Sequence, residues 1–292
     1  MKSQLLNLTA TLVALISTNI FAAAAPSAAG TGRSFKGPIG FQFWSLRDEF
    51  NKDVPSTMDK AYAMGFRVVE LAGTYGKTPE EFKAMLDARG LKAVAAHVGY
   101  DRFRDDPEGV AKEAQALGLK YIGTAGFPHK GTLTEAEVHE AAKVFNNAGK
   151  ILAQHGLKFY YHNHGYEFVP HGDGTLFDLL MQETDPKYVS FEMDVTWTVF
   201  PGQDPVKLMK KYKSRWALMH LKDLKKGVPT GSLSGGTDPA NDVVIGTGQT
   251  DWRSLLKASK KAGVKYYFIE DESPSVLMQI PQSLKYLEQV KF

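Results

Sequence analysis

The sequence contains no cysteine among its 292 residues. A protein without cysteine has neither disulfides nor a lipid anchor attached through a thiol, so its stability must come from a hydrophobic core. Long runs of basic residues are also missing, because the formal net charge is only +3 and cations cluster only in short pairs such as Lys225-Lys226. We therefore expect no nucleic acid among its partners.

The sequence also lacks an apolar run long enough to cross a membrane. The apolar stretch at residues 5–21 is shorter than the roughly 20 residues that a spanning helix needs. It follows Lys2 and precedes the small residues Ala22-Ala23-Ala24-Ala25, a pattern typical of a secretory signal peptide. The sequence predicts a signal peptide at 1–24, a flexible mature N-terminus at 25–36, and an exported protein, periplasmic or secreted, without a stable membrane anchor after cleavage.

A short motif recurs along the rest of the chain, where helical patterns give way to β-rich runs. Glycine favours the left-handed conformation that ends a helix, and the next apolar residue packs back on the last helical turn. The motif therefore predicts a helix-to-strand joint at each copy. The copies are Gly65-Phe66-Arg67, Gly90-Leu91-Lys92, Gly118-Leu119-Lys120, Gly156-Leu157-Lys158 and Gly263-Val264-Lys265.

Strands and helices alternate between these joints. The strands are expected at 39–44, 68–72, 93–97, 121–124, 159–162, 189–194, 217–221 and 266–270, and amphipathic helices at 79–88, 107–117, 135–154 and 252–262. Eight strands separated by helices predict one α/β domain at 37–292, a closed (β/α)8 TIM barrel. An open doubly wound sheet is the alternative, but the residues at 43–47, after the first strand, form no glycine-rich phosphate turn.

Side chains that bind metals or move protons follow the last four predicted strands, where TIM barrels carry their chemistry. Strand alternation places His162 and His164 on the same face of one strand, and Glu192 and Asp194 on the same face of the next. Both faces are expected to point into the barrel. Two inward carboxylates repel unless a cation or a proton lies between them. Glu192, the deeper one, is interpreted as structural. The remaining members are His220, Lys222 and Glu270.

Weaker candidates come from other strand ends and loops. Glu70 is either functional or an internal ion-pair partner of Lys222, and any aromatic ring at a strand end is either sugar-binding or ordinary packing. The glycine- and serine-rich stretch 225–242 is the longest expected loop and is predicted to be a lid. The candidate substrate contacts are His97, Glu167, Trp44, Glu70 and Trp197.

Taken together, these sequence motifs resemble those of a known family, the sugar phosphate isomerase/epimerase family of xylose isomerase-like TIM barrels. The resemblance runs from residue 40 to the eighth strand, and its most specific motifs are Tyr161-His162-Asn163-His164, His220-Leu221-Lys222-Asp223 and Gly246-Thr247-Gly248. It implies one divalent ion (Mn, Mg, Co or Zn), held at the matching strand ends by His162, Asp194, His220 and Glu270. Histidine at position 162 departs from the family, which has a carboxylate there.

The resemblance also implies a reaction. A metal-polarised carbonyl lets a base remove the neighbouring C–H proton, which gives an enediolate and then isomerisation or epimerisation of a free sugar, keto-sugar or glycoside. Glu270 is expected as ligand and base, His164 as acid and base, and Lys222 as electrostatic partner of the enediolate. Replacement of a carboxylate by His162 disfavours two-base epimerisation and leaves a one-base isomerase or a lyase.

Three alternatives stay open or are disfavoured at this stage. A lyase or hydrolase of 3-keto-glycosides remains open, as does a non-catalytic carbohydrate-binding barrel, which would need no metal. Endonucleases of the same superfamily need a histidine where Trp197 stands, so they are disfavoured. The expected partner is a small carbohydrate, and a homo-oligomer is left open.

Overall fold

The structure, a computed structural model, describes residues 29, 34, 35 and 37–292. Its main sheet has eight strands, each at a position that the sequence predicts. The strands are β1 (Gly40–Gln42), β2 (Val68–Leu71), β3 (Lys92–Ala96), β4 (Tyr121–Thr124), β5 (Lys158–His162), β8 (Val189–Asp194), β9 (Trp216–Leu221) and β12 (Tyr266–Ile269). All observed pairings within this sheet are parallel, as a (β/α)8 barrel requires.

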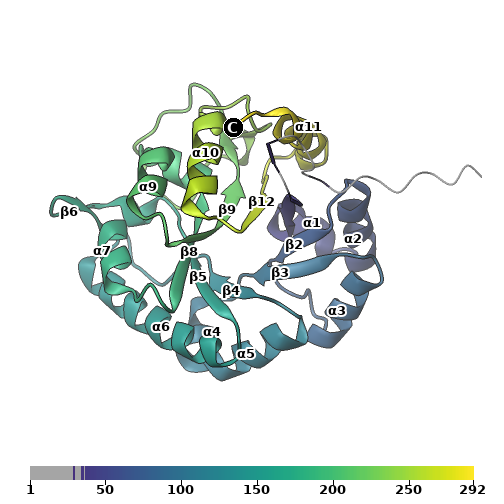
Figure 1. The fold of residues 1–292 in the computed structure, drawn as a ribbon, viewed down its shortest axis with the longest axis horizontal. Helices are drawn as coiled ribbons and strands as arrows, with labels where there is room; N and C mark the ends of the chain where they lie inside the picture. The colour runs from purple at the N-terminus through teal and green to yellow at the C-terminus, as the bar shows by residue number, and fades with distance from the viewer. Residues whose placement is uncertain (1–28, 30–33, 36) are drawn as a thin grey trace, which may run out of the picture.

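The sheet closes on itself. Its strand order is β3-β2-β1-β12-β9-β8-β5-β4, and a parallel bridge between His97 and Gly123 joins its two ends. Backbone hydrogen bonds support the closure, because Val98 N donates to Gly123 O at 2.8 Å and Lys120 N to Val94 O at 3.0 Å. Figure 1 shows the strands in the centre with the helices in a ring around them. The predicted TIM barrel is therefore confirmed.

The helices form where the sequence pattern predicts them. All five joint glycines adopt positive φ, between 66° and 98°, so each ends a helical segment in the left-handed conformation. The longest helix begins with a capping box of Thr134 and Glu137. The helices are α1 (Arg47–Phe50), α2 (Val54–Ala63), α3 (Pro79–Asp87), α4 (Tyr100–Asp105), α5 (Pro107–Ala116), α6 (Glu135–Gln154), α7 (Leu176–Glu183), α8 (Val195–Val199), α9 (Pro205–Lys211), α10 (Trp252–Ala262) and α11 (Val276–Gln289).

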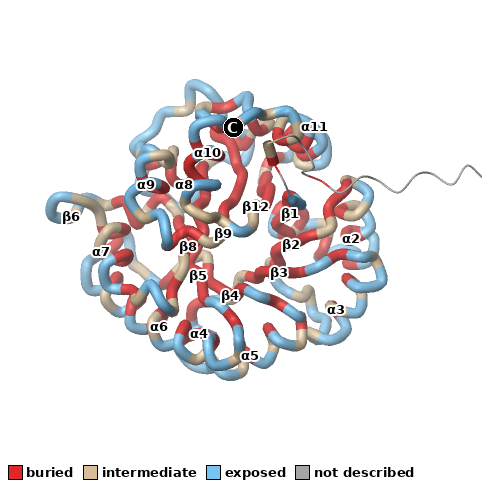
Figure 2. Tube along the Cα trace, viewed as in Figure 1, coloured by how far each residue is buried: buried red, intermediate tan, exposed pale blue. Residues whose placement is uncertain are grey.

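The hydrophobic core has two layers. A large outer layer lies between the strands and the surrounding helices, and a small cluster fills the barrel interior with Val68, Val94, Tyr160, Leu218 and Phe268 among its members. Figure 2 shows the buried residues concentrated on the strands and on the inner faces of the helices. Because the interior cluster fills the lower part of the barrel, polar side chains at the upper strand ends have a rigid base beneath them.

Only a few residues of the N-terminal segment are among those that the structure describes. The predicted signal peptide at 1–24 lies outside the described residues. Within 25–36, which was predicted to be flexible, Ala29 N donates to Gly65 O at 2.9 Å, and Phe35 packs edge-on against Tyr267 and Phe292. These two residues are buried, so they are part of the packed domain. Among the described residues, no helix is both long and apolar enough to cross a membrane.

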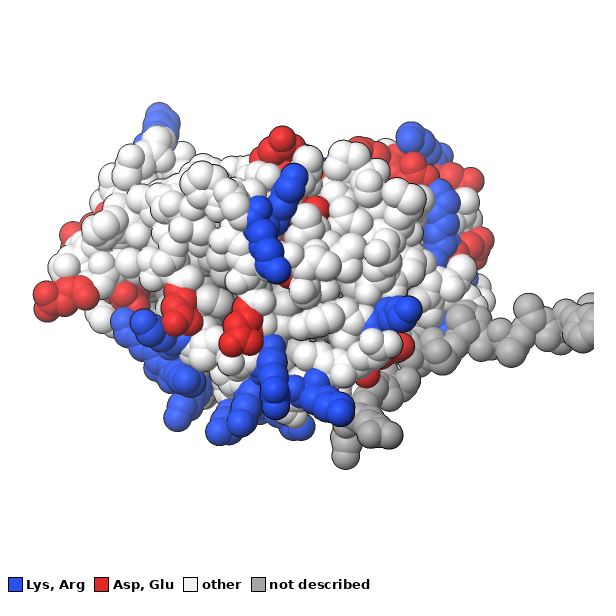
Figure 3. Space-filling view, turned by 90° about the horizontal axis from the view of Figure 1, so that it is seen from above, with Lys and Arg blue, Asp and Glu red and all other residues white. Residues whose placement is uncertain are grey.

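A long loop follows the seventh barrel strand, as predicted. Its ends are held by a short antiparallel pair, β10 (Asp223–Leu224) and β11 (Asp242–Val243). On the face seen in Figure 3, acidic and basic side chains both occur, and several of the basic ones gather along the lower edge. The smaller elements are the β6 (Pro170–His171) and β7 (Gly174–Thr175) pair and the 3-10 turns η1 (Phe43–Leu46), η2 (Tyr166–Phe168) and η3 (Pro239–Asn241).

Candidate active site

The candidate site lies at the C-terminal ends of the barrel strands. His162 ends β5, Asp194 ends β8, His220 stands one residue before the end of β9, and Glu270 directly follows β12. The strand register places neighbours side by side, because His162 pairs with Glu192 and Asp194 pairs with His220. Parallel strands with this register bring residues far apart in the sequence to one mouth of the barrel.

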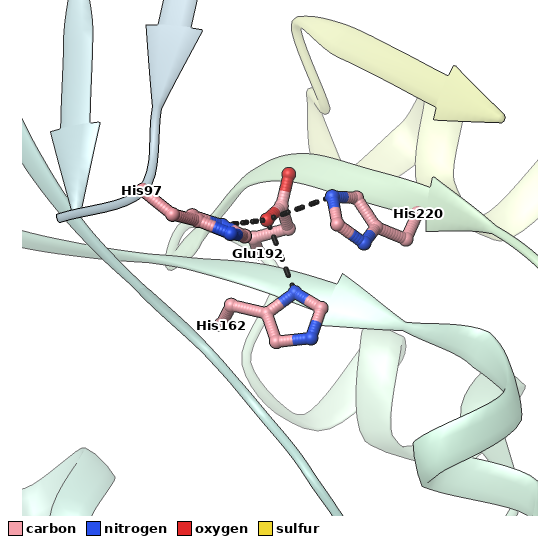
Figure 4. Close-up of side chains that lie close together, drawn as sticks. All are labelled: His97, His162, Glu192 and His220. Carbon is pink, nitrogen blue, oxygen red and sulfur yellow. Dashed lines mark hydrogen bonds and ion pairs between the residues drawn. The ribbon is translucent and has the colours of Figure 1, made fainter. Parts of the chain in front are cut away.

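A first group of side chains surrounds Glu192. Its Oε2 atom lies 3.1 Å from each of three imidazole nitrogens, namely His97 Nε2, His162 Nδ1 and His220 Nε2. Figure 4 shows the three rings converging on this carboxylate from different strands. Each of the four residues offers one ligand atom, and these four atoms all lie within 4.8 Å of one another.

A second group shares His220 and opens toward the barrel mouth. His220 Nδ1 lies 2.6 Å from Glu270 Oε2 and 3.7 Å from Asp194 Oδ2. The three residues are buried, and their ligand atoms again lie within 4.8 Å of one another. The structure thus brings together three of the four expected metal ligands. The fourth, His162, turns its Nδ1 atom toward Glu192.

Glu70 and Lys222 do not form the ion pair considered from the sequence. Glu70 Oε2 lies 2.6 Å from His220 Nε2, and Glu70 also accepts hydrogen bonds from Gln42 and Tyr160. Glu70 is therefore a hydrogen-bond partner of His220.

Lys222 is surrounded by other carboxylates. Its Nζ atom lies 2.6 Å from Glu272, 3.3 Å from Glu270 and 3.6 Å from Asp242. Lys222 is 1% exposed. Any action of Lys222 on a ligand therefore passes through these neighbours.

A cavity of about 540 Å³ opens over the two groups, within the range typical of small-molecule sites. His97, His162, His164 and Glu270 line it, together with the two aromatic rings proposed from the sequence, Trp44 and Trp197. The described lining residues include no Lys or Arg, so this wall offers no strong counter-charge to a phosphate.

Two of the expected substrate contacts are not on the cavity wall. Glu70 is fully buried among His220, Gln42 and Tyr160. Glu167 is 1% exposed, and its carboxylate accepts the backbone N–H of His164 at 2.9 Å and the hydroxyl of Tyr161. Strand alternation could not show this, because Glu167 lies in a 3-10 turn that folds its side chain back toward β5.

Burial and charge set the ionisation of these groups. Burial lowers the pKa of His164 to about 3, so this imidazole is neutral near pH 7. Burial and the neighbouring charge of Glu70 raise the pKa of Glu192 to about 7. Burial alone would lower the pKa of His220, but the negative charges of Glu192 and Glu270 outweigh it and raise that pKa.

The donor set fits a divalent cation. Asp194 Oδ2 and His220 Nδ1 are buried and have no hydrogen-bond partner, although His220 Nδ1 faces oxygens of both Asp194 and Glu270. Such atoms repel one another unless a proton or a cation lies between them. One divalent ion satisfies the Asp194, Glu270 and His220 atoms together, whereas one proton serves only a single pair. Imidazole and carboxylate ligands suit Mn, Co or Zn.

The interpretation of two residues from the sequence was incomplete. Glu192 was interpreted as structural because of its depth, yet it stands at the centre of three histidines. The signal for it was available in the strand pairing, since residue 192 lies directly beside residue 162. Glu272 was missed as well. It lines the cavity, accepts a hydrogen bond from Trp44 Nε1 at 3.0 Å and is held by Lys222.

The fold and the site together define a TIM barrel with a histidine- and carboxylate-rich pocket at its C-terminal mouth. The family described as xylose isomerase-like TIM barrel matches residues 58–291, so the chain belongs to that family. This confirms the resemblance inferred from the sequence motifs.

Related proteins of known name point to sugar-modifying enzymes. The chain is 25% identical to an inosose dehydratase of Clostridium botulinum over 286 residues, covering 87% of this chain and 94% of the relative. It is 27% identical to an inosose dehydratase of Geobacillus thermodenitrificans over 249 residues, covering 76% and 83%.

Solved structures share the fold. A sugar phosphate isomerase/epimerase from Parabacteroides distasonis superimposes with a TM-score of 0.69 at 28% identity, covering 85% of this chain and 96% of that one. The IolI protein with a bound zinc atom shares the fold with a TM-score of 0.66 at 14% identity, covering 85% and 95%.

Proposed function

We propose that the protein is a divalent-metal-dependent lyase that eliminates water or an alcohol from a polyhydroxylated ketone, such as a keto-cyclitol or a keto-sugar. The observation that carries the proposal is the position of His164. Its imidazole is half-buried and neutral, its Nδ1 atom is buried without a hydrogen-bond partner, and the side chain lines the cavity together with Glu270. Such a group is suited to accept a proton from a bound substrate.

The ligand set of the metal is part of this proposal. Asp194, His220 through Nδ1, and Glu270 would hold the ion, and His162 would add its Nε2 atom because its Nδ1 atom faces Glu192. When bound, a divalent ion supplies a Lewis acid that polarises the substrate carbonyl and so acidifies the neighbouring C–H bond.

The proton transfers fall to His164. It accepts the proton from the carbon beside the carbonyl, and the electrons of that C–H bond form the C=C bond as the β C–O bond breaks. The departing oxygen then takes the proton from His164, so the products are an unsaturated ketone and water or an alcohol. The step consumes no oxidant, reductant or second substrate, and a single histidine serves both as base and as acid.

The other expected residues assist this step. Glu167 fixes the backbone of His164, and Lys222 holds Glu270 through a 3.3 Å contact. Trp44 and Trp197 present aromatic faces to the cavity, which suit the C–H faces of a sugar or cyclitol ring. His97 offers a polar contact for a substrate hydroxyl on the same wall.

Two observations, one on relatives and one on position 162, support elimination over isomerisation. The inosose dehydratases that the chain resembles over most of its length are named for loss of water from a ketone of the inositol series. Histidine at position 162, where the resemblance implies a carboxylate base, leaves one proton-transfer residue instead of two. The cavity lining without Lys or Arg favours a non-phosphorylated substrate. Export, proposed from residues 1–24, favours the same class.

Mass spectrometry and NMR in deuterated water test the proposal. The protein, loaded in turn with Mn, Co, Zn and Mg, is incubated with inososes and with 3-keto-glycosides. Loss of water or of the aglycone supports the lyase. Deuterium incorporation without loss of water or aglycone would show an isomerase or epimerase. Binding without turnover would show a carbohydrate-binding barrel.

A His164→Gln variant tests the role of His164 in the chemistry, with His139→Gln as its control. We expect it to keep its metal and to lose turnover by about 10²–10⁴-fold, the usual contribution of a general acid–base residue. His139→Gln on the exposed surface of α6 should keep full turnover.

A further inference from the structure

Glu192 is buried at a place where an apolar residue would ordinarily fill a barrel. The side chain is fully buried, and its Oε1 atom has no hydrogen-bond partner. Burial of an ionised carboxylate destabilises the folded state by roughly several kcal/mol unless neighbouring groups compensate the charge. The compensation comes from three imidazoles at 3.1 Å from Oε2. Such an expensive arrangement at the floor of the site calls for a role.

Two of these imidazoles belong to the proposed metal ligands. His162 turns Nδ1 toward Glu192, and His220 turns Nε2 toward it. A neutral imidazole carries its proton on one nitrogen and a lone pair on the other. A carboxylate that accepts the N–H of one nitrogen therefore leaves the opposite nitrogen as the metal ligand. For His220 that opposite atom is Nδ1, which faces Asp194 and Glu270.

We infer that Glu192 is a positioning residue that fixes the ring orientation and the protonated nitrogen of His162 directly and, together with Glu70, those of His220, and so sets the affinity of the site for its metal. The inference rests on the proposed function only in its choice of metal ligands, and it does not depend on which reaction follows. Glu70 completes the assignment, because it accepts the hydrogen bond of His220 Nε2 at 2.6 Å, while Glu192 Oε2 lies 3.1 Å from the same nitrogen.

This role accounts for the departure on the fifth strand. Replacement of a carboxylate by His162 removes a negative charge from the ligand set. The strand register places Glu192 directly beside His162. A negative charge therefore lies next to the ligand instead of on it, and it accepts the hydrogen bond of the histidine. The pair thus presents an imidazole ligand made more basic by its neighbour.

The same four residues are not assigned to a second metal ion. The 3.1 Å contacts of His97 and His162 with Glu192 are hydrogen bonds, and His220 Nε2, which also lies 3.1 Å from Glu192, is hydrogen-bonded to Glu70 at 2.6 Å. An ion in their midst would displace the proton from His220 Nε2. Only while that proton stays on Nε2 does Nδ1 keep its lone pair for the ion at the mouth of the site. Metal ligands must be deprotonated at the atom that binds. Metal stoichiometry separates the two arrangements.

The test compares Glu192→Gln with the unchanged protein, using Co²⁺ and Zn²⁺ as probes. Gln keeps the size of the side chain and loses the negative charge. We expect one ion per chain in both proteins, with the dissociation constant raised about 10–100-fold in the variant, as is typical for lost outer-shell partners. The visible absorption bands of bound Co²⁺ should also shift, because two ligands lose their orientation.

Asp223→Asn is the matched control. Asp223 is a buried carboxylate that accepts from Trp252 Nε1 at 2.8 Å and from the Gly246 and Gly248 amides, and none of its hydrogen bonds within the described residues goes to a histidine. We expect this variant to lower the melting temperature and to keep the metal affinity. Glu192→Asp, which keeps the charge on a shorter side chain, should lose less affinity than Glu192→Gln, and it serves if the glutamine variant does not fold.

A double-mutant cycle with His162→Gln completes the experiment. If Glu192 acts through His162, the two losses in affinity are less than additive. Fully additive losses, an unchanged dissociation constant in Glu192→Gln, or the loss of one of two bound ions would each overturn the inference. Normal metal content in Asp194→Asn would instead refute the ligand set of the proposed function, so the two failures are distinguishable.

Discussion

His220 Nδ1 lies 2.6 Å from Glu270 Oε2, although the two atoms are not aligned as a hydrogen bond. The other ring nitrogen of His220 lies equally close to Glu70, at 2.6 Å. The imidazole therefore links a deep carboxylate layer to the mouth of the barrel. This bridge places the candidate metal site directly above a floor of fixed charges, and several measurable consequences follow from it.

Asp194→Asn should abolish both metal binding and turnover. Asp194 Oδ1 caps α8 through the Trp197 amide at 2.7 Å, and asparagine is an equally good helix cap, so the fold should persist. Metal content measured by mass spectrometry of the purified variant checks this. Asp204→Asn, which alters the cap of α9, should keep its metal. A variant at position 194 that retained one ion per chain would contradict the assignment.

Removal of divalent metal should destabilise the protein. The unoccupied ligand set leaves buried carboxylates facing one another, and a ligand at a hundredfold excess over its dissociation constant contributes about 2.7 kcal/mol. For a domain of this size we expect the melting temperature to fall by roughly 5–10 °C after treatment with a chelator. Differential scanning calorimetry with and without added Mn²⁺ or Zn²⁺ measures the change, which should be restored by the ion and stay absent in Asp194→Asn.

Lys222→Met should lower kcat far more than it changes KM. The ammonium is the cation that holds Glu270, Glu272 and Asp242 together, and its loss leaves buried carboxylates unpaired. We expect a fall in kcat on the order of 10²-fold and a loss of about 3–5 kcal/mol in the free energy of unfolding. Exposed Lys225→Met is the control. Unchanged kcat in the 222 variant would show that the lysine is only a structural partner.

Gly165→Ala should disturb the predicted lid at 225–242. A Cβ atom at Gly165 would collide with the backbone oxygen of Ser234, whereas one at Gly236 meets open space. We expect Gly165→Ala to lower kcat/KM by roughly 10–100-fold through displacement of the loop, with metal content unchanged. Gly236→Ala should behave as the unchanged protein. Equal kinetics for both variants would show that this loop does not cover the substrate.

Glu167 should make stability depend on pH. Burial raises the pKa of Glu167 from 4.5 to about 7. Between these two values the folded state holds a proton that the unfolded state has released, so the free energy of unfolding falls as pH rises from about 4.5 to 7. Removal of the group by Glu167→Gln should flatten this dependence by up to about 3 kcal/mol. Urea unfolding at a series of pH values measures it, and parallel curves for both proteins would contradict the shift.

The joints and the strand ends were predictable from the sequence for a local reason. A glycine that must adopt positive φ, such as Gly118 or Gly156, is visible in the sequence wherever a helix must stop and a strand begin. Alternation along a strand likewise shows that Glu192 and Asp194 share a face. The site on strands five to eight could be placed in this way because the barrel brings the ends of all its strands to one mouth.

The partners of the buried charges were not predictable in the same way. The assignment of Glu70 to His220, and of Lys222 to Glu270 and Glu272, depends on depth within the barrel and on side-chain rotamers. The inward turn of Glu167 depends on a 3-10 turn that no periodicity announces.

The amino-acid sequence by itself determined the barrel, its repeat of helix-to-strand joints, and the kinds of side chain at the mouth, because these follow from local periodicity and backbone preference. Only the tertiary structure decided which carboxylate serves which histidine. That choice depends on strand register and on the desolvation of charges, which are properties of residues distant in the chain. Glu192 beside His162 is its clearest case, since 30 residues separate them and one strand pairing joins them.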